Sequence, residues 1–415
     1  MKNRFVRILI SSIMGVCLLF GGCGTPAGNS SSSSSSSGNG GGDEVVNLIK
    51  PNDVVKSIVE IGAVTGRNSP WNDTITSARV AGTDLGIPVY DSQNQRMLLL
   101  YGDTFSSQKA GEGSGYNDWR SNVCAYSTDF DLFDGLVLDG WITRPGREMA
   151  KELVPSNKTD NYEMTTIPTG AIEVDGAIYM FYMSVRHWGA NGEWSVNYCG
   201  LTKSVDGGEN YTRVSDVAFT GIKDQITAEL TGYTPSVVVS HYAPGLCQIY
   251  PLAVGEYIYL YGIQGGRFDG VQLARVKASE IENFNSYEYF TGLDSDNNPV
   301  FVAGVDGCKY ISTEENKEAT QIIIGPAGEM CVMYNKYLGK YMTIYQMGQL
   351  MVMRTADNPW GEWSAPITLF GYEVYHAMYC GFMHEKYTEQ DGKIVYFMMS
   401  YWWDYESILM KLELQ

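Results

Sequence analysis

The 415-residue chain is short of charge, and of positive charge above all. Charged residues make up 18% of it, and 29 Lys and Arg stand against 47 Asp and Glu, a net charge of −18. So acidic a surface repels phosphate backbones and anionic lipid headgroups, which argues against a nucleic-acid partner. The few charges, together with 46 Gly and 29 Tyr, favour short strands and turns over long solvated helices. The composition therefore disfavours an all-helical protein.

Cysteine pairs of the kind that hold zinc are also lacking. Beyond the N-terminal segment no two cysteines form a C-x-x-C pair, which leaves a zinc site without support. Because they are widely spaced and several lie in apolar strand patterns, we expect buried free thiols rather than a disulfide framework. These cysteines are Cys124, Cys199, Cys247, Cys308, Cys331 and Cys380.

Residues 1–22 are predicted to be a lipoprotein signal peptide. Three basic residues within the first seven precede the apolar run from Ile8 to Phe20, which is too short and one-sided for a membrane-spanning helix. The run leads into Gly21, Gly22 and Cys23, and small residues before a cysteine resemble a bacterial lipobox. We therefore expect lipidation of Cys23, with plain secretion and a free Cys23 as the alternative.

Residues 23–52 are predicted to be a lipid-anchored linker. The stretch from Gly24 to Gly42 is almost wholly Ser, Gly and Asn, and such a segment buries too little apolar surface to fold. An anchor followed by a spacer displays a domain outside the cytoplasm. We therefore expect an extracytoplasmic protein that meets a bacterial cell membrane only through its lipid, with residues 53–415 as the folded domain.

Five similar units follow one another in residues 53–415. Each has an aromatic-rich run with a strand-like run before it, across a short polar turn, and another after it, and such turns are hairpin signals. Small antiparallel meanders of roughly 50 to 85 residues are typical of a β-propeller. The sequence thus predicts an all-β, five-bladed β-propeller. The five runs are Met97–Gly102, Ile178–Tyr182, Tyr257–Gly262, Tyr341–Tyr345 and Ile394–Met398.

One octapeptide, Ser204 to Tyr211, fits the Asp-box pattern S-x-D-x-G-x-x-aromatic that occurs on blade hairpins. Its Asp206 is predicted to cap a tight turn by accepting bonds from backbone N–H groups. We expect this aspartate to be structural rather than catalytic.

Two carboxylates face each other in the first unit if its hairpin is symmetric about Gln93 and Asn94. Opposed residues then have numbers that sum to 187, which sets Asp84 against Asp103 with Cβ atoms ~4.5–5.5 Å apart. At that distance their ionisations are coupled. Glycoside hydrolysis requires two carboxyl groups, one to protonate the leaving oxygen and one to attack the sugar or activate water. Asp84 and Asp103 are the expected catalytic pair; two solvated turn carboxylates, or a metal site in the channel, are the alternatives.

Further polar and aromatic side chains recur at one end of successive units. Glu329 heads the inner strand of the fourth unit, where it supplies a third acid or ends the strand in a salt bridge. An Arg-His-Trp segment follows the strand of the second unit, with side chains suited to holding sugar hydroxyls and stacking on a ring. The expected substrate-binding residues are Glu329, Arg186, His187, Trp188, Arg267 and His384.

Several phrases of the sequence resemble domain of unknown function 4185, part of which is classed as glycoside hydrolase family 183, the endo-D-arabinofuranases. They include AGTDLGIPVYD, LLLYGDTF, IPTGAIEVDGAIYMFYMSVRHWG and YLYGIQGGRFDGVQLARV, and the resemblance runs from Arg79 to Leu414. It implies a five-bladed propeller whose active members cut D-arabinan, the furanose polymer of mycobacterial arabinogalactan and lipoarabinomannan. The two aspartates that such members use match Asp84 in TDLG and Asp103 in YGDTF.

The expected function is therefore that of a surface endo-D-arabinanase, a glycosidase without a cofactor or a bound metal. A glycan-binding lipoprotein without turnover is the alternative from another class, and a glycosidase acting on another furanose polymer is a third. A sialidase is disfavoured because no F-R-I-P segment accompanies the arginines that would have to cluster. Those arginines are Arg79, Arg186, Arg267 and Arg354.

Overall fold

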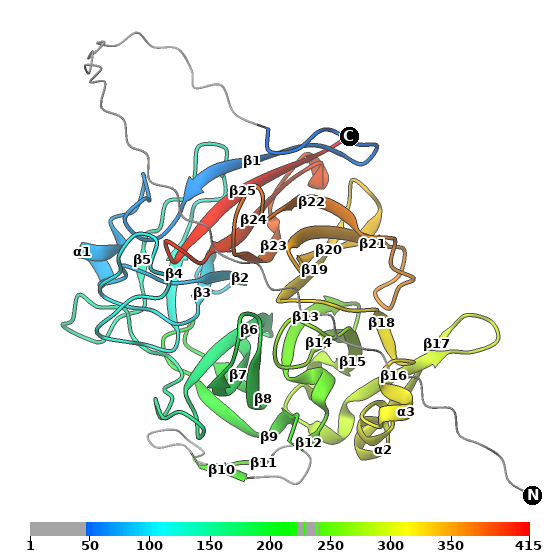
Figure 1. Ribbon diagram of the computed structural model, residues 1–415. Helices are drawn as coiled ribbons and strands as arrows, with labels where there is room; N and C mark the ends of the chain where they lie inside the picture. The colour runs from blue at the N-terminus through cyan, green and yellow to red at the C-terminus, as the bar shows by residue number, and fades with distance from the viewer. Residues whose placement is uncertain (1–46, 223–226, 230–236, 240) are drawn as a thin grey trace, which may run out of the picture. The chain divides into compact units, whose positions relative to one another are not determined.

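The computed structural model describes residues 47–222, 227–229, 237–239 and 241–415. Their strands form five small antiparallel sheets that follow one another around a ring in chain order, as Figure 1 shows. The five-bladed β-propeller predicted from the repeats is confirmed. Each predicted aromatic run is the second strand of a blade.

Blades 1 and 2 come first along the chain. Blade 1 consists of β2 (Leu85–Asp91), β3 (Arg96–Tyr101), β4 (Val123–Ser127) and β5 (Gly140–Trp141). Blade 2 consists of β6 (Thr165–Val174), β7 (Ala177–Trp188), β8 (Trp194–Ser204), β9 (Thr212–Thr220) and β12 (His241–Tyr242), the last of which pairs in parallel with β9. A two-stranded sheet of β10 (Thr227–Glu229) and β11 (Val237–Val239) interrupts the chain between β9 and β12.

Blades 3 and 4 follow. Blade 3 contains β13 (Gln248–Val254), β14 (Tyr257–Ile263), β15 (Val271–Lys277), β16 (Glu288–Leu293), β17 (Pro299–Ala303) and the short β18 (Gln321–Ile323), which pairs with β15. Blade 4 contains β19 (Met330–Asn335), β20 (Lys340–Met347), β21 (Leu350–Ala356) and β22 (Ile367–Gly371). The α-helices of the described chain are short: α1 (Thr74–Ala78), α2 (Gly304–Ile311) and α3 (Glu314–Lys317).

Blade 5 joins the two ends of the folded chain. Its order is β23 (Met378–Glu389), β24 (Ile394–Tyr401), β25 (Glu406–Leu414) and then β1 (Val55–Ala63), which runs antiparallel to β25 with Val55 opposite Leu414. A strand from the start of the domain therefore completes the last sheet and closes the ring. The repeat pattern did not predict this closing strand.

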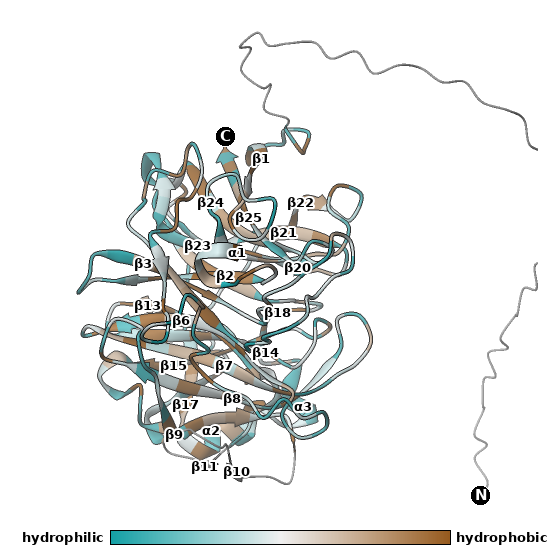
Figure 2. Ribbon diagram, turned by 90° about the vertical axis from the view of Figure 1, so that its left-hand side faces the viewer, coloured by the Kyte–Doolittle hydropathy of each residue, from teal (hydrophilic) through white to brown (hydrophobic). Residues whose placement is uncertain are grey.

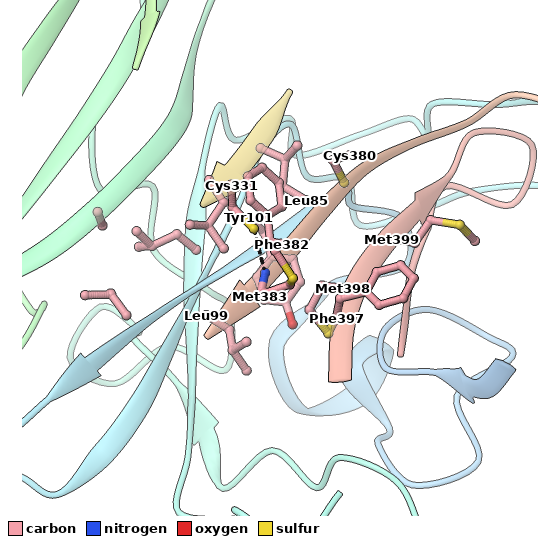
Figure 3. Packing of buried hydrophobic residues seen from close by; sticks show 14 of the residues in the cluster. Leu85, Leu99, Tyr101, Cys331, Cys380, Phe382, Met383, Phe397, Met398 and Met399 are labelled. Carbon is pink, nitrogen blue, oxygen red and sulfur yellow. Dashed lines mark hydrogen bonds between the residues drawn. The ribbon is translucent and has the colours of Figure 1, made fainter. Parts of the chain in front are cut away.

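Apolar side chains fill the centre of the ring, so the channel is packed rather than open. In Figure 2 the hydrophobic segments follow the strands, whereas the loops are mostly hydrophilic. Figure 3 shows Leu85, Phe382 and Met383 packed together with buried sulfur-bearing side chains. A cavity of about 20 Å³ remains between the inner strands, lined by Leu85, Ile249 and Phe382 among others. It has room for a water molecule but not for a sugar.

The structure confirms two of the smaller predictions. The six cysteines of the folded chain are buried and free. In the turn after β8, Oδ1 of Asp206 accepts hydrogen bonds from the Ser204 hydroxyl (2.7 Å) and the backbone N–H of Asn210 (2.9 Å), so this aspartate caps a turn.

Residues 1–46 lie outside the described residues, and with them the predicted signal peptide and Cys23. In the part of the chain that is described, no helix is long and apolar enough to cross a membrane.

Candidate functional site

The inner strands of the five blades all begin at the same end of the ring, which we call the mouth. Asp84 immediately precedes β2, Thr165 begins β6, Glu329 immediately precedes β19, and Tyr379 is the second residue of β23. Asp103 follows β3, the neighbour of β2. Contacts between these side chains, which come from four blades, show that they converge on one place.

Asp84 is held by a tyrosine from the neighbouring blade. Its Oδ2 accepts a 2.7 Å hydrogen bond from the hydroxyl of Tyr379, which is itself buried. Its Oδ1 is enclosed and receives no hydrogen bond from any described residue. Burial, followed by the negative charges of Asp103 and Glu329, outweighs the Tyr379 bond and raises the pKa of Asp84 to about 7.

The predicted hairpin register holds through most of β2 and β3 but fails next to Asp84. Pairs from Ile87 with Leu100 to Asp91 with Arg96 keep the expected sum of 187. A bulge at Gly86 (φ +89°) then shifts the pairing, and the carbonyl of Asp84 accepts a hydrogen bond from the N–H of Gly102 (3.2 Å). Asp84 is therefore opposite Gly102, one residue out of the predicted register, and not directly opposite Asp103.

Gly102 leaves the space in which the Asp84 carboxyl lies. A Cβ atom at this position would be 2.4 Å from Oδ1 of Asp84, well inside van der Waals contact. Only a residue without a side chain therefore allows Asp84 this orientation.

Asp103 lies in a more strongly hydrogen-bonded place than Asp84. Its Oδ1 accepts bonds from Nε1 of Trp119 (2.6 Å) and from the hydroxyl of Thr165 (2.5 Å), and the residue is 7% exposed. Burial raises the pKa of Asp103 to about 6, against the lowering effect of Thr165, Trp119 and the charge of Lys158. The ammonium group of Lys158 lies 5.0 Å above the Trp119 ring. The carboxylate of Asp103 is thus better stabilised than that of Asp84.

Glu329 and Arg267 pair with each other at the mouth. Nε and Nη2 of Arg267 donate to the two carboxylate oxygens of Glu329 at 2.7 and 2.6 Å. The guanidinium also lies 4.6 Å above the ring of Tyr379, whose hydroxyl bonds to Asp84. The structure thus contains the salt bridge at this strand end, one of the two roles expected for Glu329. A continuous set of contacts joins Glu329, Arg267, Tyr379 and Asp84.

The Arg-His-Trp segment forms the exposed end of β7. Trp188 is 37% exposed and packs edge-on against Trp194 (5.6 Å between ring centres), which lies under the Arg267 guanidinium. Trp188 is therefore linked to the mouth. His187 instead bonds to Asp160 through Nδ1 (2.6 Å), and the side chain of Arg186 is exposed.

His384 does not belong to this group, which corrects the sequence-based expectation. It lies five residues beyond Tyr379 along β23, and a strand rises roughly 3.3 Å per residue, so it is far from the mouth. Its neighbour Lys386 lies over the ring of Tyr90, near the far end of β2. Burial lowers the pKa of His384 to about 4. The pairing of β23 with β24 is also interrupted between Met383 and Thr388, so His384 lies in an irregularity that the repeat pattern did not predict.

Sequence reasoning missed the residues that hold the two aspartates: Tyr379, Thr165, Trp119 and Gly102. Thr165 and Tyr379 occupy in their blades the place that Glu329 occupies in blade 4, so aligning the five units by their inner strands would have indicated them. Trp119 and Gly102 carry no comparable signal. Among the described residues, no group of three or more His, Cys, Asp or Glu side chains is placed to hold a metal ion.

Solved structures with a similar arrangement are distant in sequence. A Bacteroides ovatus protein is 13% identical with a TM-score of 0.49, over 82% of this chain and 88% of that chain. An exo-β-1,3-galactanase from Phanerochaete chrysosporium is 10% identical (TM-score 0.46; 86% and 64%), and the GH43_1 enzyme from Xanthomonas citri is 13% identical (TM-score 0.40; 80% and 87%). No curated protein matches the chain. Likeness this remote carries no information on the reaction.

The sequence pattern of one protein family, in contrast, spans nearly all of the folded domain. It is described as Domain of unknown function (DUF4185) and matches residues 68–411, from before the first blade into the last strand. The match includes both aspartates of the mouth and every side chain that bonds to them. The chain belongs to the DUF4185 family.

Proposed function

We propose that the protein is a glycoside hydrolase whose catalytic pair is Asp84 and Asp103. The observation that carries the proposal is the pair itself: a half-buried carboxyl group (Asp84) and a buried one (Asp103) at the ends of neighbouring strands. The charge of Asp103 acts on Asp84, and their pKa values are raised to about 7 and about 6. An unpaired buried carboxylate is costly, so such a pair is unfavourable without a use for it. Two carboxyl groups in different protonation states are what glycoside hydrolysis requires.

The surroundings of each aspartate suggest its part in the reaction. Asp103 accepts two hydrogen bonds and feels the charge of Lys158, all of which favour its carboxylate form. Asp84 accepts one bond and feels the negative charges of Asp103 and Glu329, which favour its protonated form. Asp84 is therefore the general acid, and Asp103 is the ionised partner.

The reaction then consumes one water molecule. Asp84 gives its proton to the glycosidic oxygen while the bond from that oxygen to the anomeric carbon breaks. Asp103 either attacks the anomeric carbon, to be released later by water, or takes a proton from the water that attacks directly. In the first route Asp84 takes the proton of the water that releases the sugar from Asp103. In the second, Asp103 passes the proton it took from water to solvent, and Asp84 takes one up from solvent. In both routes the sugar gains the hydroxyl of water.

The substrate we propose is D-arabinan, cut within the chain. The resemblance of the segments around Asp84 and Asp103 to endo-D-arabinofuranases supports this choice. So does the predicted lipid anchor at Cys23, since a polymer too large to import has to be trimmed outside the cytoplasm. We thus propose an extracytoplasmic, membrane-anchored endo-D-arabinanase that cleaves the D-arabinan of arabinogalactan and lipoarabinomannan.

Digestion of purified D-arabinan tests the proposal directly. We expect oligosaccharides to be released, with the anomer of the first product read by proton NMR. Asp84→Asn and Asp103→Asn variants are the matched controls, since each should fold and release little. Cleavage of another furanose polymer but not of D-arabinan would keep the reaction and change the substrate.

A glycan-binding protein without turnover is the second candidate, favoured by the exposed rings of Trp188 and Phe268 beside the mouth. It predicts that the wild-type protein binds the polymer, forms no product, and binds equally well after Asp84→Asn and Asp103→Asn. Product formation by the wild type excludes it.

A further inference from the structure

Two exposed tryptophans lie in a turn at the mouth. Neither the blade repeats nor the acid pair explains why tryptophan stands at these two positions. Trp402 and Trp403 occupy the turn between β24 and β25, and are 38% and 37% exposed. Burying a tryptophan side chain stabilises a protein by a few kcal/mol, so an exposed pair is unexpected on a solvated turn. Exposed aromatic rings beside polar groups are typical of ligand-binding surfaces.

The turn is fixed to the backbone that carries Asp84. The carbonyl of Tyr405, at the end of the turn, accepts a 2.8 Å hydrogen bond from the N–H of Thr83, the residue before Asp84. The Trp402 ring packs edge-on against the Tyr405 ring, with 5.5 Å between ring centres. Trp402 is thus one aromatic ring away from the acid pair.

A second line of contacts runs from the same turn to Asp103. Tyr405 packs against Phe105 (6.0 Å between ring centres), and Phe105 stacks on Trp119 (6.1 Å), which donates to Asp103. Consistent with this position, burial and the charges of Asp84 and Asp103 raise the pKa of Tyr405 well above its usual value. The turn therefore lies next to both acids.

Both tryptophans are held in place before any ligand binds. The carbonyl of Trp403 accepts hydrogen bonds from the N–H of Gly113 (3.1 Å) and from Nε2 of Gln108 (3.2 Å), and the His376 ring stacks on Trp403 at 6.1 Å. A Cβ atom at Gly113 would be 2.7 Å from Nε1 of Trp402, so the indole lies flat against this loop. A ring that is already fixed loses little conformational entropy on binding.

Another exposed indole of the mouth, that of Trp188, lies on the opposite flank of blade 1. Trp188 belongs to blade 2 and reaches Asp84 through Trp194, Arg267 and Tyr379, whereas Trp402 belongs to blade 5. Figure 1 shows that blades 2 and 5 are the two neighbours of blade 1 in the ring. The acid pair therefore lies between Trp188 on one side and Trp402 and Trp403 on the other.

We propose that the turn Trp402–Trp403 is a sugar-binding platform and that the polymer runs from it, across Asp84 and Asp103, to Trp188. The proposal rests on the proposed glycosidase function and deepens it: sugar units are bound on both sides of the cleavage point. Such a path places an internal linkage at the acids and explains endo-cleavage. The C–H faces of the sugar rings would pack on the indoles, as apolar surfaces do on aromatic side chains.

The first test compares long and short D-arabino-oligosaccharides as substrates of Trp402→Ala. We expect KM for the long substrate to rise about tenfold, the effect of losing one such contact, with kcat little changed. The KM for the shortest cleaved substrate should change much less. Trp402→Phe keeps an aromatic face and should recover most of the affinity, and it also serves if the alanine variant fails to fold.

Phe133→Ala is the matched control, because Phe133 is 68% exposed but follows β4, whose end faces away from the mouth. It should leave both KM values unchanged. Trp402 and Trp188 lie on different sides of the acids. The fold increases in KM for the long substrate that their alanine substitutions cause should therefore multiply in the double variant. A KM for the long substrate that is unchanged in both Trp402→Ala and Trp403→Ala overturns the platform, as does an equal effect of Phe133→Ala.

Binding without turnover separates this inference from the proposed function. In Asp103→Asn, we expect D-arabinan to quench indole fluorescence, and the added Trp402→Ala substitution to weaken that binding. If the wild type forms no product but this binding depends on Trp402, the proposed function fails and the platform stands. If the wild type cleaves D-arabinan while binding by Asp103→Asn is indifferent to Trp402, the platform alone fails.

Discussion

The hydroxyl of Tyr379 donates a 2.7 Å hydrogen bond to Asp84 although the two residues are 295 positions apart in the chain. The bond joins blade 5 to blade 1 at the point where the ring closes. A donor to a carboxylate favours its charged form, so this bond keeps the pKa of Asp84 lower than burial alone would set it. Tyr379 thus positions the Asp84 carboxyl, and its removal is expected to change the titration of that group.

Removing this donor should move the pH profile upwards. In Tyr379→Phe the pKa of Asp84 rises, because its charged form loses a hydrogen bond. If Asp84 is the general acid, the basic limb of the kcat/KM profile shifts to higher pH. The matched control is Tyr387→Phe, since Tyr387 is equally buried in β23 and its hydroxyl has no partner among the described residues. A profile that moves in both variants, or in neither, contradicts the role given to Tyr379.

Glu329→Gln should move the same limb in the opposite direction. The substitution removes a negative charge near Asp84 and leaves the guanidinium of Arg267, so the pKa of Asp84 falls. It also leaves that guanidinium largely buried without its partner, which costs roughly 3–5 kcal/mol at a fully buried site and less here. The control is Glu413→Gln, which breaks an exposed pair with Lys56 and should change the free energy of unfolding by under about 1 kcal/mol. A basic limb that rises or stays in Glu329→Gln rejects the contact set from Glu329 to Asp84.

Gly102→Ala should impair activity without unfolding the protein. The new Cβ would meet Oδ1 of Asp84 at 2.4 Å, so the carboxyl has to move, and a displacement of about 1 Å at a catalytic group costs about 10²-fold in rate. Gly221→Ala is a suitable control, since the nearest atom to its Cβ would be at an ordinary 3.4 Å. Near-normal kcat in Gly102→Ala, with an unchanged melting temperature, would show that the position of Asp84 is not critical.

Replacing either aspartate should separate stability from activity. Asp84→Asn and Asp103→Asn should each lower the rate by roughly 10²–10⁴-fold, the scale for a positioned proton donor or acceptor. The wild-type rate should be bell-shaped in pH, with two apparent pKa values that belong to the coupled pair. Full activity in either variant removes that residue from the mechanism.

The same variants should differ from the wild type in how stability depends on pH. Both pKa values are raised in the folded state from 3.8, so the stability they contribute is fully present below pH 4 and is lost as pH rises through about 6 to 7. Asn carries no charge and escapes this loss. At pH 8 the free energy of unfolding of Asp84→Asn should therefore exceed that of the wild type by roughly 1–3 kcal/mol, with a higher melting temperature. This difference in free energy should narrow towards pH 4. A variant that melts lower at pH 8 would show that Asp84 is structural.

The sequence predicted the parts of the site that depend on local order. Hairpin symmetry brought Asp84 and Asp103 together on adjacent strands, because a register of fixed sum holds as long as pairing is regular. It failed by one residue at Gly86, whose positive φ allows a bulge that the letters G-I-P do not reveal. Regular strand pairing can be predicted from residue spacing, but a bulge depends on contacts with another blade. Here the contact is with Ser407 of blade 5, whose Oγ would lie 2.8 Å from a Cβ at Gly86.

The donors to the two aspartates were not predictable in the same way. Thr165 and Tyr379 come from the neighbouring blades 2 and 5, so their contacts depend on how whole sheets pack around the ring. His384 shows the converse error: a residue next to an inner-strand pattern was assigned to the mouth, although strand length places it elsewhere. The order of the blades around the ring can be counted from the sequence. The distance of a residue from the mouth can be judged only when the first residue of its strand is known.

The pairing of β1 with β25 sets the order in which the propeller can be completed. Val55 and Leu414 are neighbours in the last sheet but are separated by almost the whole domain in the chain. Each of blades 1 to 4 is built from one continuous segment of the chain and can assemble while the chain is still emerging. Blade 5 has to wait for the final residues, and closing so long a loop is slow. Tyr379 reaches Asp84 only when blade 5 is in place, so the acid pair is completed last. In a nascent or truncated chain Asp84 lacks the hydrogen bond from Tyr379.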